Sequence, residues 1–316
     1  MDWYSSFKAA VFFSLAIIGT PANIAILVAL GSLWVSGVKF GPNEKILSAL
    51  ALTNTILIMT RGLPYSLFVV GAATFFNDTA CSVIVYISRL SRTMTFSLSS
   101  LLSGYQFLVM KSPHPTWTAC RLKVSKMLGL IMFTMILPNL GICFCSVLYS
   151  RHASNTTGLE YTYNLGYCIV HFPDRATYLG FGIAIVIRDL VFVIFMATTS
   201  TAILLLLYRH QRKIKQMSVS GFNTSRETKA AKIVVALVVS DILFLGVENT
   251  IFLYILTCKI VNPYAVDVRF FFSTCYATVF PIIILKTNNN IKEILTSCLK
   301  IIIIKLSNSV KVSDLL

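Results

Sequence analysis

The chain has 316 residues, of which 56% are hydrophobic and only 12% are charged, and its formal net charge is +15. So apolar a chain cannot bury its side chains in one or two soluble cores, which excludes an ordinary soluble protein and makes lipid its natural solvent. A charge of this size would indicate nucleic acid in a soluble protein, but basic residues gathered on one side of a membrane explain it without such a partner. We therefore expect no nucleic-acid binding.

Seven apolar runs are long enough to cross a bilayer, whose hydrocarbon layer of roughly 30 Å needs about 20 helical residues. In chain order they span residues 7–33, 45–71, 82–110, 126–149, 178–208, 230–257 and 268–286. The first run is longer than the apolar core of a secretory signal, and Pro21-Ala22-Asn23 is a poor cleavage site, so we interpret it as a retained span. The sequence predicts an all-α membrane protein with a seven-transmembrane helix bundle over residues 1–286.

Lysine and arginine predict the orientation, because cytoplasmic loops carry the excess of both. With the N-terminus outside, the inner segments and the tail hold eighteen of these residues, and the outer segments hold four. This distribution predicts an extracellular N-terminus and a cytoplasmic tail over residues 287–316. From Asn288 onward, apolar residues such as Ile291 and Leu295 stand among lysines in the pattern of an amphipathic helix on the inner leaflet, so membrane lipid is an expected partner.

The predicted outer loops carry possible sites of modification. Asn77 and Asn155 each begin an N-x-Thr sequon, and Asn155 is the better glycan acceptor because Asn77 lies close to the bilayer. Cys81 opens the third predicted helix, and Cys168 lies in the second outer loop. In an oxidising compartment these two cysteines either form a disulfide or stay free thiols.

Charged residues within the predicted spans are the most informative, because an arginine at mid-bilayer costs roughly 2.5 to 3.5 kcal/mol unless it faces protein or water. At a rise of about 1.5 Å per residue, Arg61, Arg89 and Arg92 all fall about 12 to 17 Å below the outer ends of their helices. Gly62 and Pro64 are expected to bend the helix beside Arg61 and to shape a cavity. Further charged residues at similar depth are Arg188, Asp189 and Glu248, and Asp241 lies deeper.

Two interpretations of these charges stay open. In the first, the three acids neutralise most of the four arginines in a structural ion-pair network. In the second, the surplus positive charge of an outward-facing pocket binds an anionic group such as a carboxylate or sulfate, for which the bidentate guanidinium is suited. Two further polar residues in the first two helices, Asn23 and Asn54, are expected to form hydrogen bonds across helices rather than to contact a ligand.

Enzymatic signatures are missing from the sequence. It contains no phosphate-binding GxxxxGK, no HExxH and no GxSxG, and its four histidines are far apart. The cysteines form no CxxC pair of the kind that holds zinc. We expect no catalysis, no cofactor and no bound metal.

Four stretches of the sequence resemble vomeronasal type 1 receptors, and among these most of all the class A-related olfactory receptors of fish. The resemblance extends from about residue 23 to residue 285. The stretches are LSALALTNTILIMTRGLP in the second helix, CSVIVYISRLSRTMTFSLSSLLSGYQFLVMKSP in the third, NLGYC in the second outer loop and RDLVFVIFMATTSTAILLLLYRHQRKIKQM in the fifth. Gly104-Tyr105-Gln106 and Phe280-Pro281 depart from rhodopsin-like receptors at large in ways that are typical of the vomeronasal group.

The resemblance implies a rhodopsin-like fold and a chemosensory G protein-coupled receptor. Its expected partners are a small pheromone or odorant and a heterotrimeric G protein of the inhibitory type. The expected location is the plasma membrane of an olfactory or vomeronasal sensory neuron. The resemblance also supports the bridge between Cys81 and Cys168 and the glycan at Asn155.

Carried over to the buried charges, the resemblance makes Arg61, Arg89 and Asp189 look like shared framework positions, which favours the ion-pair interpretation for them. Glu248 and Arg269 match no family pattern, so we expect them to tune ligand choice. The candidate ligand-binding residues are therefore Arg61, Arg89, Arg92, Arg188, Glu248 and Arg269. The candidate residues facing a G protein are Tyr105, Gln106, Arg209, Arg212 and Lys213.

Two alternative functions remain. The chain could be another rhodopsin-like receptor, with a peptide or lipid ligand. It could also be a transporter that uses the buried charges as an ion relay, although the sequence has no internal repeat of the kind found in many transporters.

Overall fold

The structure is a computed structural model that describes residues 3–71, 77–111, 115–152, 161–217, 224–258, 263–287 and 291–297. Within these ranges it leaves out the side chains of residues 207, 210, 211, 213–238, 241, 263 and 287.

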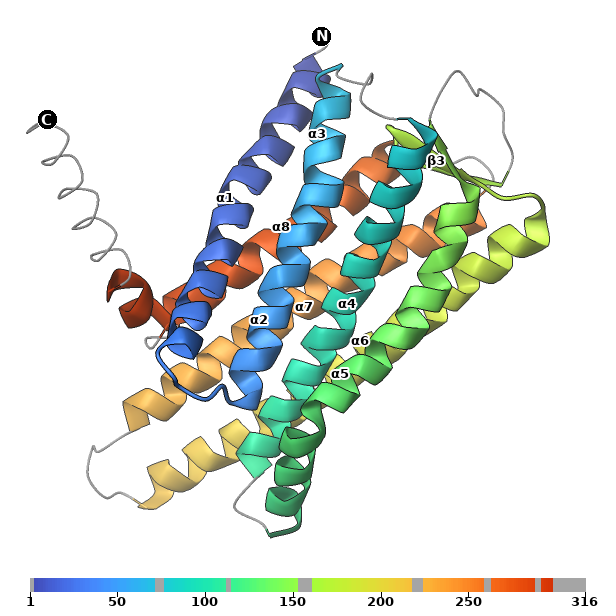
Figure 1. Ribbon diagram of the computed structural model, residues 1–316. Helices are drawn as coiled ribbons and strands as arrows, with labels where there is room; N and C mark the ends of the chain where they lie inside the picture. The colour runs from blue at the N-terminus through green and yellow to red at the C-terminus, as the bar shows by residue number, and fades with distance from the viewer. Residues whose placement is uncertain are drawn as a thin grey trace, which may run out of the picture.

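The described chain forms a bundle of long helices with a small sheet at one end (Figure 1). The helices are α1 (Trp3–Val35), α2 (Pro42–Leu57), the π-helical turn η1 (Ile58–Gly62), α3 (Leu63–Val69), α4 (Asp78–Lys111), α5 (Pro115–Tyr149), α6 (Arg175–Met217), α7 (Thr224–Thr257) and α8 (Pro263–Thr287). The strands are β1 (Ser150–His152), β2 (Thr162–Asn164) and β3 (Cys168–His171). We call the end that carries the sheet the sheet end of the bundle.

Each of the seven predicted helices is present, and most extend beyond their predicted ends. The second corresponds to α2, η1 and α3 taken together. The fourth was expected to begin at Lys126 but begins at Pro115, a residue that is favourable in the first turn of a helix. The fifth continues past Tyr208 to Met217. Polar residues end an apolar run without ending the helix, so hydropathy alone places these boundaries too far inward.

Five helical segments in the described part of the chain are long and apolar enough to cross a membrane. They are Trp3–Val35, Pro42–Val69, Pro115–Tyr149, Arg175–Leu206 and Tyr264–Lys286. α7 contributes a shorter apolar segment, Ile242–Thr257, and α4 is not among the five. Five of the predicted helices thus have the length and apolarity that a membrane span needs, and for α4 and α7 the crossing stays a prediction.

α4 is polar because it lies inside the bundle rather than against lipid. It packs against α2, α5 and α6, and all residues from 91 to 100 are buried. Its serines reach other helices: Ser99 Oγ lies 2.6 Å from the hydroxyl of Tyr276 in α8, and Ser103 Oγ lies 2.7 Å from Thr199 Oγ1 in α6. Small hydroxyl residues allow close helix packing and hydrogen bonds between helices, which explains why the central helix is the least apolar.

The two deep asparagines form hydrogen bonds across helices, as predicted. Asn23 Nδ2 donates to the carbonyl oxygen of Ala277 in α8 at 2.9 Å and to that of Gly19 in its own helix at 2.8 Å. Thr95 Oγ1 of α4 donates to Asn54 Oδ1 of α2 at 3.2 Å. These bonds tie α1 to α8 and α2 to α4, each for a modest gain of about 0.6 to 2 kcal/mol.

The helix beside Arg61, which the sequence predicts to bend, contains the π-helical turn η1. Pro64 has no N–H, and in a regular α-helix its ring would clash with the carbonyl group four residues earlier. The chain widens at this point instead, and the Leu63 N–H donates to the carbonyl oxygen of Ile58, five residues back. Arg61 is therefore displayed from a π-turn, a feature that is frequent at functional sites.

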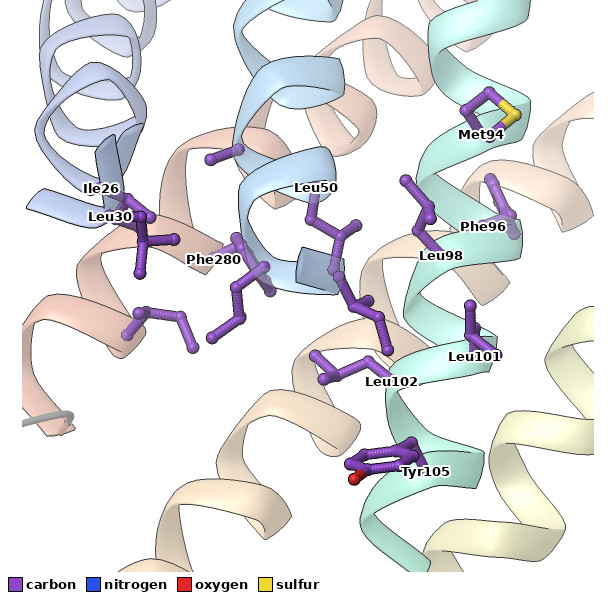
Figure 2. Close-up of a cluster of buried hydrophobic side chains, with 14 of the residues drawn as sticks. Ile26, Leu30, Leu50, Met94, Phe96, Leu98, Leu101, Leu102, Tyr105 and Phe280 are labelled. Atoms are coloured by element: carbon purple, nitrogen blue, oxygen red, sulfur yellow. The ribbon is translucent and has the colours of Figure 1, made fainter. Parts of the chain in front are cut away.

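A hydrophobic core fills the half of the bundle farther from the sheet. Leu30 of α1, Leu50 of α2 and Phe280 of α8 meet there with Leu102 and Tyr105 of α4 (Figure 2). Lipid tails are as apolar as these side chains, so close packing rather than exclusion from water holds the helices together.

The beginning of the predicted tail helix packs on this core. Residues 291–297 are helical, Ile291 is buried in the core, and Ile294 and Leu295 lie against it. In these first turns the apolar side chains thus contact the bundle, and the position of the helix on the inner leaflet stays a prediction. Residues 298–316 lie outside the described chain.

The sheet is antiparallel, with β3 between β1 and β2. Gly166 has a φ of +87° in the turn between β2 and β3, a conformation that favours glycine. A disulfide joins Cys168, the first residue of β3, to Cys81 near the start of α4. Of the two possibilities left open for these cysteines, the bridge is the correct one.

We predict that Cys81→Ser and Cys168→Ser each lower the free energy of unfolding of the purified protein by about 2 to 4 kcal/mol. Each substitution removes the covalent link between α4 and the hairpin that β2 and β3 form. The double variant should be no less stable than either single variant, since both remove the same bond. Thermal unfolding in detergent measures this, with Cys120→Ser, a change at an exposed free cysteine, as the control. Additive losses would contradict the bridge.

Candidate ligand-binding site

Five arginines from four helical elements converge in the half of the bundle nearer the sheet. Four of them contact the same two carboxylates, which places these four at matching depths. The five are Arg61 of η1, Arg89 and Arg92 of α4, Arg188 of α6 and Arg269 of α8. Two buried acids accompany them, Asp189 of α6 and Glu248 of α7, both 0% exposed.

Arg92 is the centre of the ion-pair network. Its Nε donates to Glu248 Oε1 at 2.5 Å, its Nη1 donates to Asp189 Oδ2 at 2.8 Å, and its Nη2 donates to Asn249 Oδ1 at 3.0 Å. Each of the three guanidinium nitrogens therefore donates a hydrogen bond, and Arg92 is itself only 5% exposed. A buried charge is tolerated when its donors are satisfied in this way.

Arg61 and Arg188 also have carboxylate partners. Arg61 Nη1 donates to Glu248 Oε1 at 3.0 Å and to Ser273 Oγ at 2.9 Å. Arg188 binds the neighbouring Asp189 through Nε and Nη2, at 3.0 and 2.8 Å. The structural ion-pair interpretation therefore holds for Arg61, Arg92 and Arg188.

Arg89 and Arg269 rest mainly on aromatic rings. The Arg89 guanidinium carbon lies 5.0 Å from the ring centre of Phe181 and 5.6 Å from that of Tyr163. The Arg269 guanidinium carbon lies 4.1 Å from the ring centre of Phe252, while its Nε is 3.8 Å from Glu248 Oε1, too long for a hydrogen bond. Aromatic faces stabilise a cation less than a paired carboxylate does.

A cavity of about 570 Å³ lies among these side chains. All five arginines and Lys8 line it, whereas Asp267 is the single acid among its described lining residues. Glu248, expected to contact a ligand, does not line the cavity, and neither does Asp189. The carboxylates of Glu248 and Asp189 contact the arginines from outside the cavity, so the charge on the cavity wall is mainly positive.

A second polar cluster on the cavity wall was not predicted. Asp267 of α8 accepts hydrogen bonds from the hydroxyls of Tyr4 and Tyr65, and it pairs with Lys8 Nζ at 2.9 Å. The sequence reasoning missed it because the seventh helix was expected to begin at Val268, which left Asp267 in a loop. α8 begins at Pro263 instead.

The hairpin of β2 and β3 forms another part of the wall, through residues 162–167. Burial raises the pKa of the Tyr167 phenol to about 12, against the opposing effect of Arg61. Tyr167 is therefore neutral at physiological pH. The hairpin thus adds aromatic and hydrogen-bonding groups to the cavity but no further charge.

The remaining candidate residues lie away from the cavity. Near the far end of α4, Tyr105 is buried in the hydrophobic core and Gln106 is half-buried, while Arg209 and Arg212 of α6 are exposed. Asn77 is exposed and caps α4, because its Oδ1 accepts the Ala80 N–H at 2.7 Å. Predictions on Asn155, and on the side chains of Lys213 and Asp241, lie outside the described part of the chain.

We predict that Arg92→Met is the most destabilising single change among the five arginines, because it leaves two buried carboxylates short of a partner. A loss of about 3 to 5 kcal/mol is expected. Thermal unfolding of the purified protein measures it, and Arg188→Met, which leaves Asp189 paired with Arg92, is the matched comparison. A smaller loss for Arg92→Met than for Arg188→Met would refute the central role of Arg92.

Comparison with known proteins agrees with this architecture. The family model described as "Vomeronasal organ pheromone receptor family" matches residues 7–297. The chain is 33% identical over 293 residues to olfactory receptor class A-like protein 1 of Danio rerio, covering 92% of each chain. It is 22% identical over 285 residues to human vomeronasal type-1 receptor 1, covering 89% of this chain and 80% of the human one. The chain therefore belongs to the vomeronasal type 1 receptor family, a family of multi-pass membrane receptors.

Proposed function

We propose that this chain is a chemosensory receptor that binds a small anionic molecule in the arginine-lined cavity and activates a heterotrimeric G protein, of the inhibitory type. The observation that carries the ligand class is the charge of the cavity wall. Six cationic side chains and one acidic side chain line it among the described residues, and the two other acids of the site lie behind the arginines.

The proposal includes seven membrane spans with the N-terminus outside. Five helices are apolar enough to cross on their own, and α4 and α7 lie beside them in the same bundle (Figure 1). At about 1.5 Å per residue, the 34 residues of α4 are long enough to span the hydrocarbon layer. The excess of lysine and arginine in the segments remote from the sheet supports a cytoplasmic position for that end.

An anion suits this cavity because a guanidinium gains most from a bidentate acceptor. The cavity volume of about 570 Å³ is within the range of small-molecule sites, and aromatic rings alternate with the charges on its wall. Amines and other cations would meet a wall of like charge. Carboxylates and sulfates are the ligand groups that this wall favours.

The arginines divide into two roles in this proposal. Arg92 and Arg188 hold carboxylates of the protein, and Arg61 shares Glu248 with Arg92. Arg89 has no carboxylate within ion-pair distance among the described residues, and its Nη1 has no hydrogen-bond partner there. Arg89 is therefore the first candidate to bind the ligand anion, with Arg269 as the second.

Signalling requires only that the ligand binds the active arrangement of helices more tightly than the resting one. The ion-pair network connects η1, α4, α6, α7 and α8, so an added anion changes electrostatic interactions on all of these elements. Exposed Arg209 and Arg212 at the other end of α6 are available to a G protein or to acidic lipid.

We predict that Arg89→Met abolishes the response to an acidic ligand while surface expression stays near that of the wild type, because Arg89 supports no carboxylate of the protein. The measurement is a G protein activation assay in transfected cells, with surface labelling in parallel. A screen of acids, amines and steroids of similar size supplies the ligand.

Two comparisons keep this test specific. The amide of the active acid should be at least tenfold weaker on the wild type, and Arg175→Met, at an exposed position outside the cavity, should leave the response unchanged. Equal potency of the acid and its amide would refute an anionic ligand.

The topology is tested separately. We predict that an N-terminal epitope tag is stained on intact cells and that a C-terminal tag is stained only after permeabilisation. Tags accessible on the same face would exclude an odd number of spans and the receptor role that depends on it.

A further inference from the structure

The arginines outnumber the acids even after every ion pair of the site is counted. Within the described residues, four arginines share Glu248 and Asp189, Arg89 pairs with neither acid, and Lys8 is matched by Asp267. The site thus has three positive charges more than its own carboxylates neutralise.

These charges are close enough to repel one another. Arg61, Arg92 and Arg269 all approach the same oxygen atom of Glu248, and Arg89 lies one helical turn from Arg92 in α4. Repulsion between like charges is strong where the surroundings are poorly polarisable, and cation–π contacts offset only part of it. A resting receptor without a ligand needs a further counter-charge in this cavity.

Three N–H groups of these arginines have no hydrogen-bond partner among the described residues. They are Arg61 Nε, Arg89 Nη1 and Arg269 Nε, and all three side chains line the cavity. Arg61 is only 5% exposed, so bulk water does not readily satisfy its Nε. Buried donors of charged groups without acceptors are costly, which indicates that the site accommodates an acceptor from solution.

We propose that the cavity binds a small inorganic anion, which is chloride in extracellular fluid, between Arg61, Arg89 and Arg269. Chloride supplies the missing negative charge, accepts N–H donors from several directions and is small enough to leave room for water in a cavity of about 570 Å³. The inference deepens the proposed function, since an acidic ligand would displace this ion. It does not require that function, because the excess charge is present without any ligand.

The test measures thermal unfolding of the purified full-length receptor without ligand or G protein. Sodium chloride is titrated from zero to about 150 mM, a physiological ionic strength, and the general effect of salt is measured on the variants described below. The unfolding temperature should rise saturably by about 2 to 4 °C, as expected for an ion present at about ten times its dissociation constant. An unfolding temperature that does not respond to chloride, or a rise that does not saturate, would overturn the proposal.

Variants separate a bound ion from a general salt effect. Arg89→Gln and Arg269→Gln should each remove most of the chloride-dependent rise, and Arg175→Gln, at an exposed position outside the cavity, should retain it. Glu248→Gln removes a competing carboxylate and should shift the chloride titration to lower concentrations. An unchanged titration in Arg89→Gln, Arg269→Gln and Glu248→Gln would also overturn the proposal.

If the cavity variants cannot be purified, the titrations of the wild type and Arg175→Gln still decide between a saturable and a non-specific effect. The result is independent of the ligand screen. A receptor that binds chloride but responds to no acid would refute the proposed ligand class alone. A receptor that responds to an acid but does not bind chloride would refute the chloride site alone.

Discussion

The carboxylate of Glu248 is the constraint on which the sheet end of the bundle depends. It is fully buried on α7 and faces guanidiniums from η1, α4 and α8 through the same oxygen atom. A buried ion costs several kcal/mol if it lacks partners, so these elements must keep their relative depth and rotation for the structure to persist. The π-turn that contains Arg61 and the central position of α4 both bring an arginine into contact with Glu248.

The bundle divides into two halves with different physical character. Away from the sheet, leucines, isoleucines and aromatic residues pack without a comparable set of charges among the described residues (Figure 2). Near the sheet, ions and aromatic rings surround a cavity that the disulfide-tethered hairpin partly covers. α4 runs through both halves, with arginines in one and leucines in the other. A change in charge balance near the sheet therefore acts on a helix that is embedded in the core of the opposite half.

Much of this architecture could be predicted from hydropathy and spacing. The apolar runs predicted the helices, and a count of about 1.5 Å per residue placed Arg61 and Arg92 at the depth where both meet Glu248. The ends of the helices could not be predicted in the same way, because helices continue through polar residues beyond the lipid. That error left Asp267 in a loop, although it belongs to α8 and pairs with Lys8.

Partners contributed by loops were also beyond prediction. Tyr163, one of the two aromatic rings beside Arg89, comes from β2, far along the chain from α4, and no periodicity links the two. Sequence reasoning therefore treated Arg89 and Arg61 alike, as buried arginines at matching depth. Only their surroundings distinguish them, since Arg61 forms an ion pair with Glu248, whereas Arg89 lies over aromatic rings.

The π-turn η1 has a consequence for insertions and deletions in this helix. A π-turn holds one residue more than the α-helical turn that it replaces, and each residue of an α-helix turns the chain by about 100°. Loss of a single residue between Ile58 and Gly62 would therefore remove the bulge and leave α2 and α3 in nearly the same relative rotation, but it would set the ring of Pro64 against the carbonyl group four residues earlier. Insertion of a further residue would instead rotate α2 against α3, so that Asn54 would turn away from Thr95 or Tyr65 would turn away from Asp267. The order of side chains along this helix therefore tolerates substitution far better than a change in length.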